Sequence, residues 1–380
     1  MIHTVSTTSP ASTEVADGRA MRGMAHAARG FSLIELMIAM VLGLLVVAGL
    51  INLFVANRKA YQVQSGNNYL QENMRIASDR MGWSLRMVDF WGGNKAAGVT
   101  VDASATGTVN DKGDCDGTWA TAITYSSTGG GGIFGYDGAA SSPIDSTCIG
   151  GTANYVPGSD VLVLRYADPQ VLSPGPVPVA ASTITGNADR IFLLSTPGNR
   201  AELFAGSVPA PQPNATLMRY AYPYQIEMYY LRPCNVMTGS TCTASADGGQ
   251  PLPTLMRMRL SDGNFVSDPV VDGIEQLKVE YGETSPATGI ALEYHDADAV
   301  GNWANVISAR ISLVAVNPVR DLTVPHVATY TVGNCTYTIN NGKAATTTGC
   351  ADFKPYGDKP WQFVRASQQF VVQLRNRVRG

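Results

Sequence analysis

The chain has 380 residues, of which 45% are hydrophobic and 15% charged, with a formal net charge of −3. This composition excludes a disordered chain. It also argues against strong nucleic-acid binding through overall charge, because no basic excess is present to release counterions from phosphates. The 39 glycines and 21 prolines favour a loop-rich, β-leaning body over a helical bundle.

Apolar residues concentrate near the N-terminus. Residues Phe31 to Ala56 form a stretch of 26 residues with a single charge, Glu35. At about 1.5 Å of rise per residue, a helix of this length crosses roughly 30 Å of hydrocarbon. No later segment has an uncharged apolar run of that length, so we expect one transmembrane segment and one large body beyond it.

Six cysteines all follow the apolar stretch. An even number of cysteines in a loop-rich exported body indicates a disulfide framework. The alternative is six unpaired thiols in a cytosolic protein, but no CxxC or Cys/His cluster offers them a metal or redox role. Basic residues flank the stretch on both sides and only mildly favour a cytoplasmic N-terminus. Because short loops close at the lowest entropic cost, spacings of 33, 8 and 15 residues predict three sequential pairs, Cys115 with Cys148, Cys234 with Cys242, and Cys335 with Cys350.

The start of the apolar stretch is unlike an ordinary secretory signal, in which the cleavage site follows the apolar residues. Here Arg29-Gly30 directly precedes them, and Glu35 lies five residues in, counting Phe31 as the first. A carboxylate within hydrocarbon needs a partner. If the chain is cut between Gly30 and Phe31, the new α-ammonium group of a neighbouring copy can be that partner.

Residues 29–36, Arg-Gly-Phe-Ser-Leu-Ile-Glu-Leu, resemble the prepilin motif of type IV pilins and type II secretion pseudopilins. The resemblance implies that a membrane aspartyl peptidase cuts after Gly30 and methylates the new N-terminus, Phe31. It also implies that Glu35 supports assembly. The alternative is an ordinary signal anchor that happens to contain Glu35. A leader of 30 residues is long for this class, and a start at Met24 would shorten it to seven.

Beyond the span the helix is expected to continue to about Phe90, with Gly92-Gly93 as its stop. Glu72 and Asp79 lie three and four residues from Arg75, where opposite charges meet on a helix surface. Apolar residues recur every three or four positions and mark one buried helical face: Leu70, Met74, Ala77, Met81, Leu85 and Val88.

The remaining chain is typical of β-structure, with short runs of branched and aromatic residues bounded by Gly, Pro, Asp and Ser. Residues 96–158 resemble surface loops held by cysteines, and the basic C-terminal residues Arg365, Arg375, Arg377 and Arg379 are expected on a solvated face. The expected strands are Ser159–Tyr166, Arg190–Leu194, Tyr224–Tyr230, Leu255–Leu260, a turn leading into a strand within residues 270–282, and a central strand at Val306–Val316.

Three segments, Leu70–Arg75, Gly273–Gly282 and Ala309–Val314, resemble the PilW-type minor pilins, relatives of the J-type pseudopilins. The resemblance implies an α+β fold of type IV pilin-like lollipop form. In that fold one long N-terminal helix, its first half transmembrane, packs on a loop-rich antiparallel β-sheet body. The expected domains are a leader at 1–30, the transmembrane half of the helix at 31–57, its amphipathic half at 58–93, and a β-rich globular domain at 94–380.

Catalytic and metal-binding patterns are sparse. Beyond the leader the only histidines are His295 and His326, and no GxSxG or HExxH motif is present. Asp111, Asp114 and Asp116, and the segment 295–298, could offer oxygens to calcium, but neither ends in a bidentate glutamate. We therefore expect no enzymatic activity, no cofactor and no metal.

The resemblance implies a minor pilin that helps to initiate type IV pilus assembly at the fibre tip and supports adhesion and twitching motility. Its partners would be other minor pilins, the major pilin, the prepilin peptidase, the pilus assembly platform of the inner membrane and a tip adhesin, with no nucleic acid. Before assembly it would cross the inner membrane once with its body in the periplasm, and afterwards lie at the pilus tip on the cell surface. The alternatives are a minor pseudopilin of a type II secretion system, and a tip adhesin or DNA-capture module that uses the disulfide-held loops.

Overall fold

The computed structural model describes residues 30–110, 113–126, 130–144, 146–170, 187–208, 219–284 and 292–378. The expected leader, apart from Gly30, lies outside the described residues, and so do Asp111 and Arg379. The chain divides into two compact units, Met1–Tyr61 and Gln62–Gly380. The division falls inside the first helix, so the helical residues after Tyr61 belong to the same unit as the β-strands.

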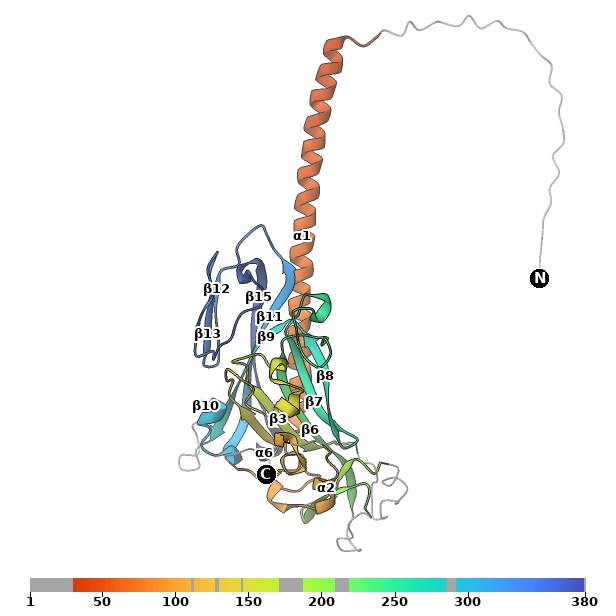
Figure 1. The fold of residues 1–380 in the computed structure, drawn as a ribbon, viewed down its shortest axis with the longest axis vertical. Helices are drawn as coiled ribbons and strands as arrows, with labels where there is room; N and C mark the ends of the chain where they lie inside the picture. Colours follow the sequence, from red (N-terminus) through yellow and green to blue (C-terminus); the bar gives the residue numbers. More distant parts are fainter. Residues whose placement is uncertain are drawn as a thin grey trace, which may run out of the picture. The chain divides into compact units, whose positions relative to one another are not determined.

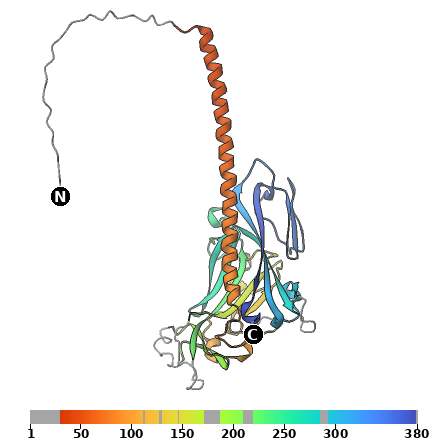
Figure 2. The same cartoon turned by 180° about the vertical axis from the view of Figure 1, so that it is seen from behind.

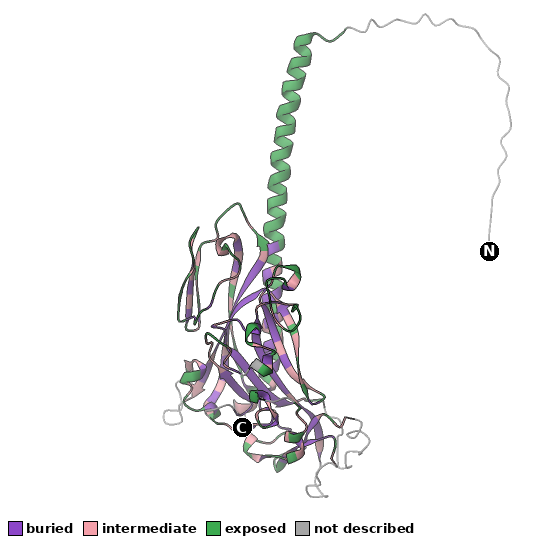
Figure 3. Ribbon diagram, viewed as in Figure 1, coloured by how far each residue is buried: buried purple, intermediate pink, exposed green. Residues whose placement is uncertain are grey.

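Helix α1 runs from Leu33 to Met87 (Figure 1). In the first unit its residues are exposed, as the green part of the helix in Figure 3 shows. This part is long and apolar enough to cross a membrane. A helix that is apolar on all sides and has no protein around it needs an apolar environment.

In the second unit α1 is amphipathic. All six residues of the predicted apolar face are buried, with Ala77, Met81, Leu85 and Val88 fully so, which confirms the periodicity. The helix ends at Met87, before the expected Phe90, because Asp89 has a φ of 60°. A left-handed residue terminates a helix, and here the Asp89 N–H donates to the carbonyl of Arg165 at 3.4 Å.

The larger sheet of the described residues has eight strands in the order β1-β5-β4-β6-β3-β2, with β7 added to β6 and β8 to β7. Its pairs are antiparallel, as expected, except β1 with β5, which is parallel. The strands are β1 (Val99–Val101), β2 (Ile133–Tyr136), β3 (Val161–Ala167), β4 (Ile191–Thr196), β5 (Arg200–Ala205), β6 (Tyr220–Arg232), β7 (Thr254–Ser261) and β8 (Asn264–Asp272).

A second sheet of the described residues has four antiparallel strands in the order β10-β9-β11-β15. The third has the order β12-β13-β14. β11 lies between two partners, so the predicted central strand is confirmed. The strands of the second and third sheets are β9 (Ile274–Thr284), β10 (Leu292–His295), β11 (Val306–Arg320), β12 (Ala328–Val332), β13 (Cys335–Ile339), β14 (Thr346–Thr348) and β15 (Phe363–Gln373).

The other expected strands are also present as β3, β4, β6 and β7, most of them longer than predicted. The run 270–282 is divided: residues 270–272 end β8, Gly273 turns the chain with a φ of 72°, and β9 follows.

The tract 96–158 is not simply surface loop. It contains β1, β2 and the short helices α2 (Ala103–Gly107), α3 (Gly117–Ala120) and α4 (Ser146–Ile149). Its sparse apolar side chains, such as Ile123, Ile133 and Phe134, are buried in the main core. The expectation was wrong because the buried residues occur singly or in adjacent pairs among many small and polar residues, so no period appears in the sequence.

The part of α1 that follows Gln62 lies between the four-stranded sheet and strands β6–β8, as both sides of the molecule show (Figures 1 and 2). Asn73 donates through Nδ2 to the Asp272 carbonyl at the end of β8, at 2.8 Å. Ser84 donates through Oγ to Glu227 of β6 at 2.5 Å. At the end of the helix Asn376 donates to the Val88 carbonyl at 2.8 Å. These polar contacts fix the helix along its buried face.

Candidate assembly site

The beginning of α1 is closed by two reciprocal hydrogen bonds. The Ser32 N–H donates to Glu35 Oε2 at 3.0 Å, and the Glu35 N–H donates to Ser32 Oγ at 3.2 Å. This is a capping box, which satisfies two backbone donors at a helix start. The acidic side chain in the first turn also complements the positive end of the helix dipole.

Glu35 therefore has a partner within its own chain, which the sequence argument from charge did not find. The local signal was present, since Ser-x-x-Glu ahead of an apolar run is the sequence pattern of a capping box. The hydrogen bond uses Oε2 and an uncharged amide. Among the described residues, no ion pair is present at this carboxylate.

Gly30 and Phe31, the two residues at the expected cleavage point, are both exposed, and Phe31 is exposed by 88%. A Cβ atom on Gly30 would meet nothing within 4 Å, and the residue is not in the left-handed region. The fold of this chain therefore does not require glycine at position 30. A requirement for glycine there must come from a molecule that acts on the chain.

In the second unit, α1 is anchored to the end of β8 through Asp272. Tyr69 donates its hydroxyl to Asp272 Oδ1 at 2.9 Å, beside the Asn73 contact. Burial, reinforced by the Asp272 charge, raises the pKa of Tyr69 well above its ordinary value. The phenol therefore stays protonated as a donor at any physiological pH.

Two of the C-terminal arginines are buried, which contradicts the expected solvated face. Arg365 on β15 pairs with Glu275 at 2.6 Å, and both side chains are 1% exposed. Arg377 pairs with Asp89 just beyond α1, and its guanidinium lies 4.2 Å from the centre of the Tyr125 ring. Arg375 is exposed, as expected. Buried charges are retained only when they are paired, so these arginines connect distant parts of the chain.

A third buried pair joins Asp160 and Lys278 at 2.7 Å. Asp160 also accepts hydrogen bonds from the backbone N–H groups of Gly138 and Val279, each at 2.8 Å. Burial raises the pKa of Asp160 to about 6, although Lys278 acts in the opposite direction. The sequence did not reveal this pair because its members lie 118 residues apart.

Three disulfides close loops of the second unit and join the cysteines in sequence order, Cys115–Cys148, Cys234–Cys242 and Cys335–Cys350. The first connects the 3₁₀ turn η2 (Gly113–Cys115) to α4, the second lies in the β6–β7 connection, and the third joins β13 to the loop after β14. Each therefore holds a connection rather than linking one sheet to another.

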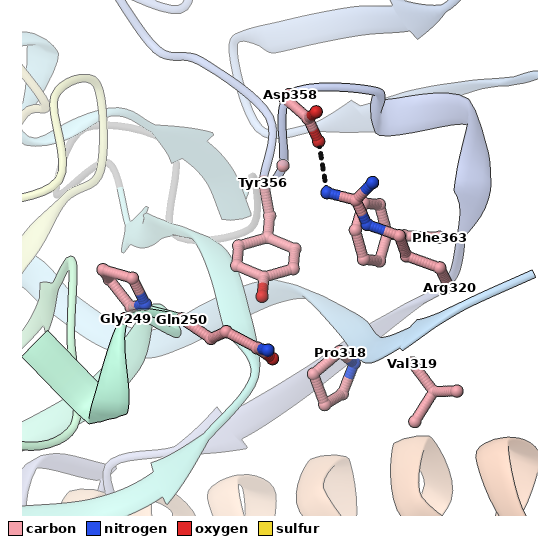
Figure 4. Close-up of a pocket in the computed structure, with 10 residues that line it drawn as sticks. Gly249, Gln250, Pro318, Val319, Arg320, Tyr356, Asp358 and Phe363 are labelled. Atoms are coloured by element: carbon pink, nitrogen blue, oxygen red, sulfur yellow. Dashed lines mark hydrogen bonds and ion pairs between the residues drawn. The ribbon is translucent and has the colours of Figure 1, made fainter. Parts of the chain in front are cut away.

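A shallow pocket of about 900 Å³ opens where β11 ends. Figure 4 shows Tyr356 and Phe363 on its wall and Arg320 reaching toward Asp358. The two charged groups pair at 2.6 Å, and the guanidinium lies 5.5 Å from the centre of the Phe363 ring. The groove is thus lined mainly by apolar and aromatic groups, with Gln250 and the Arg320–Asp358 pair as its polar side chains.

The remaining candidate ligands have structural partners. Asp116 caps α3 by accepting from the Trp119 N–H at 2.8 Å. His326 lies 2.9 Å from Asp321, and His295 lies 3.6 Å from Glu293. In the part of the chain that the structure describes, no group of three or more His, Cys, Asp or Glu side chains is placed to hold a metal ion.

Two protein-family models match the chain, one near its N-terminus and one in its C-terminal part. Residues 26–51 match the family model of the prokaryotic N-terminal methylation motif. Residues 240–376 match the model of type IV pilus-assembly protein W. Both family models belong to type IV pilins, so the chain is similar to PilW-like type IV pilins over these two regions.

Other comparisons add little. No curated protein sequence matches the chain. A type IV-like pilin, TTHA1219 from Thermus thermophilus, is 15% identical over 49% of this chain and 83% of its own, with a TM-score of 0.17. That score is too low to support any structural argument.

The PilW-like region extends from before β7 through β15 and contains the Glu275–Arg365 pair and Lys278. Cys335–Cys350 lies inside it, whereas Cys115–Cys148 lies outside. The matched part thus includes β9, β11 and β15, which form part of the β-structure beside α1. Strands β1–β6 of the eight-stranded sheet lie between the two matched regions and are covered by neither.

Proposed function

We propose that this protein is a minor pilin, a structural subunit that helps to start type IV pilus assembly at the fibre tip. The observation that carries the proposal is the exposed Gly30-Phe31 pair directly before a capped helix whose first part is apolar enough to cross a membrane. A peptidase can reach that bond without unfolding any described element. The expected cut lies between Gly30 and Phe31, followed by methylation of Phe31.

Glu35 is the proposed assembly residue. In the bilayer its carboxylate is capped by the Ser32 amide but lacks a counter-charge. A charged group in hydrocarbon is retained only when a partner offsets its cost. In a bundle of subunits, the α-ammonium group of Phe31 on a neighbour supplies that partner, so the benefit of Glu35 appears when subunits stack.

The size of the mature chain supports a minor role. Removal of 30 residues leaves 350, more than a repeating shaft subunit needs. The proposed partners are the other minor pilins, the major pilin, the prepilin peptidase and the assembly platform of the inner membrane. The body occupies the periplasm before assembly and the pilus tip at the cell surface afterwards. Adhesion and motility follow from the pilus, and the protein itself is not an enzyme.

The test is a strain whose only copy carries Glu35→Gln, compared with Glu35→Ala and Ser32→Ala. Glutamine at this position still accepts the Ser32 N–H, so it keeps the cap and removes only the charge. Ser32→Ala breaks one of the two capping bonds and keeps the charge. The readouts are surface piliation and the amount of this protein in sheared pili.

If the charge drives assembly, both Glu35 variants lose incorporation and piliation while Ser32→Ala retains most of both. If Glu35→Gln behaves like wild type, Glu35 acts only as a cap and the assembly proposal fails. Normal piliation with loss of secretion on deletion of the gene would instead identify a type II pseudopilin. Normal piliation with loss of attachment or DNA uptake would identify a tip adhesin.

A further inference from the structure

Four exposed apolar side chains stand at the end of β11 and on the connection that follows it. They are Val319, Leu322, Val324 and Val327, exposed by 56%, 76%, 59% and 53%, and we call them the apolar tip. Leu322 is the most exposed large hydrophobic residue of the described part of the second unit. Elsewhere in that part such residues occur singly or as the neighbours Val236 and Met237. A concentrated apolar patch marks a contact surface.

The apolar tip has a defined backbone. The Asp321 N–H donates to the Gln362 carbonyl at 2.7 Å, and the His326 N–H donates to the Trp361 carbonyl at 2.8 Å. Between them the Thr323 N–H donates to Asp321 Oδ1 at 2.8 Å. The connection is therefore fastened at both ends, and its apolar side chains point outward while its polar groups are used internally.

The charges beside the apolar tip are also used internally. Arg320 reaches into the groove toward Asp358, while Val319 projects from the other side of the strand (Figure 4). Asp321 and His326 lie 2.9 Å apart. The basic side chains Arg320 and His326 are thus both paired with carboxylates, so the tip offers mainly its apolar side chains for a contact.

The direction of β11 shows where the apolar tip lies on the second unit. A Cβ atom on Gly82 would lie 3.9 Å from Val372, which pairs with Ala309 of β11. Near the other end of β11, a Cβ atom on Gly66 of α1 would clash with the side-chain amide of Asn317. β11 therefore runs along α1 toward the helix N-terminal end, and the tip follows just beyond Asn317.

Chain length bounds the distance to the apolar stretch. Gly66 is ten residues beyond Ala56, the last residue of that stretch. Ten residues span at most about 36 Å even when fully extended. The connecting chain therefore allows the end of the body that carries the apolar tip to reach the bilayer surface.

We propose that the apolar tip inserts into the headgroup region of the membrane and forms a second lipid contact of the unassembled subunit. Side chains of this kind at an interface bury apolar area among the lipid headgroups and upper acyl chains. Together with the helix, this contact fixes how the body is rotated before the subunit leaves the bilayer. The proposal rests on the proposed anchoring of residues 31–57, and the experiment separates the two.

The test places a thiol-reactive bimane probe at Leu322→Cys in the full-length protein, one copy per phosphatidylcholine nanodisc. The six native cysteines are bonded in pairs, so the probe labels only the new thiol. Val371→Cys is the matched control, because Val371 is equally apolar, is 55% exposed, and pairs with Arg310 at the other end of β11. Leu45→Cys reports on the apolar helix itself. Discs are prepared with and without lipids that carry a nitroxide quencher near the headgroup.

We expect the probe at position 322 to emit at shorter wavelength and to lose most of its fluorescence with the quencher lipid, whereas the probe at 371 changes little. Quenching at position 45 without quenching at 322 leaves the anchor intact and overturns the tip contact. No quenching at position 45 overturns the anchoring proposal itself. A blue shift at 322 that appears only with two copies per disc and without lipid quenching also overturns the proposal, because the tip then binds a second copy.

Discussion

The carboxylate of Asp89 and the guanidinium of Arg377 form a buried ion pair across 288 residues of sequence. Tyr125 donates its hydroxyl to the same carboxylate, and Arg377 also donates to the Trp303 carbonyl at 2.7 Å. The short helix α6 (Arg375–Val378) is thereby fastened to a residue just beyond the end of α1. This helix therefore takes part in the fold of the body.

Replacing Arg377 by methionine should lower the free energy of unfolding by about 3–5 kcal/mol, because it leaves the Asp89 charge buried without its partner. Arg375→Met is the matched control, since Arg375 lies two residues away and is exposed. Urea unfolding followed by tryptophan fluorescence measures both. Equal, small effects of the two variants would show that the buried pair does not stabilise the body.

The stability of the body should rise as the pH falls from 7 to 4 through the titration of Asp160. The pKa of Asp160 is raised from 3.8 to about 6 by burial. A carboxyl group with a raised folded-state pKa stabilises the fold below its unfolded pKa and loses that contribution as the pH rises through the folded value.

The measurement compares wild type with the double variant Asp160→Asn/Lys278→Met, in which both charges are absent. The free energy of unfolding of wild type, minus that of the double variant, should increase by about 1–2 kcal/mol as the pH falls from 7 to 4. A difference that is constant over this window, or that moves in favour of the double variant, would contradict the assignment.

The disulfides should contribute in the order of their loop lengths. In the loop-entropy account, removing Cys115–Cys148 costs about 4 kcal/mol, Cys335–Cys350 about 3 and Cys234–Cys242 about 2.5. Paired Cys→Ser variants and urea unfolding test the order. Peptide mapping under non-reducing conditions tests the pairing itself, and cross-paired peptides or free thiols would refute it.

Processing should depend on Gly30 even though the fold does not. Gly30→Ala should be cut poorly, with folding and disulfides unchanged, because a Cβ atom there meets nothing in the chain. Gly43→Ala is the control, since its Cβ atom also meets nothing. Mass spectrometry of wild type should find an N-terminus at Phe31 with one added methyl group. A mature N-terminus at Met1 or Met24 in assembled material would be inconsistent with the motif.

Local periodicity made the helix and several of the longer strands predictable. The buried face of α1 repeats every three or four residues, and β3, β4, β6, β7 and β11 are dense runs of branched and aromatic residues. These signals survive in a single sequence because each depends on residues that are close neighbours. The strands β1 and β2 were missed because they are short and lie among Gly, Ser and Thr.

Charged residues were harder to place, because their burial depends on partners that the sequence does not identify. Lys278 lies on β9 and is 2% exposed only because Asp160 reaches it from the residue before β3. Arg365 is buried by Glu275 in the same way. Glu35 is the opposite case, since its local partner Ser32 was readable from the sequence and was overlooked in favour of a distant one.

The way α1 is held has a mechanical consequence. Contacts to Asn317, Asp272, Glu227 and Asn376 are spread along the helix from Gly66 to Val88, and β11 beside it is hydrogen-bonded to strands on both sides. A pull along the helix axis therefore loads these contacts together in shear instead of peeling one strand at a time. Resistance to such a load depends on the rate of forced unfolding more than on equilibrium stability. A force applied to this part of α1 is thus shared by all of its contacts with the β-strands.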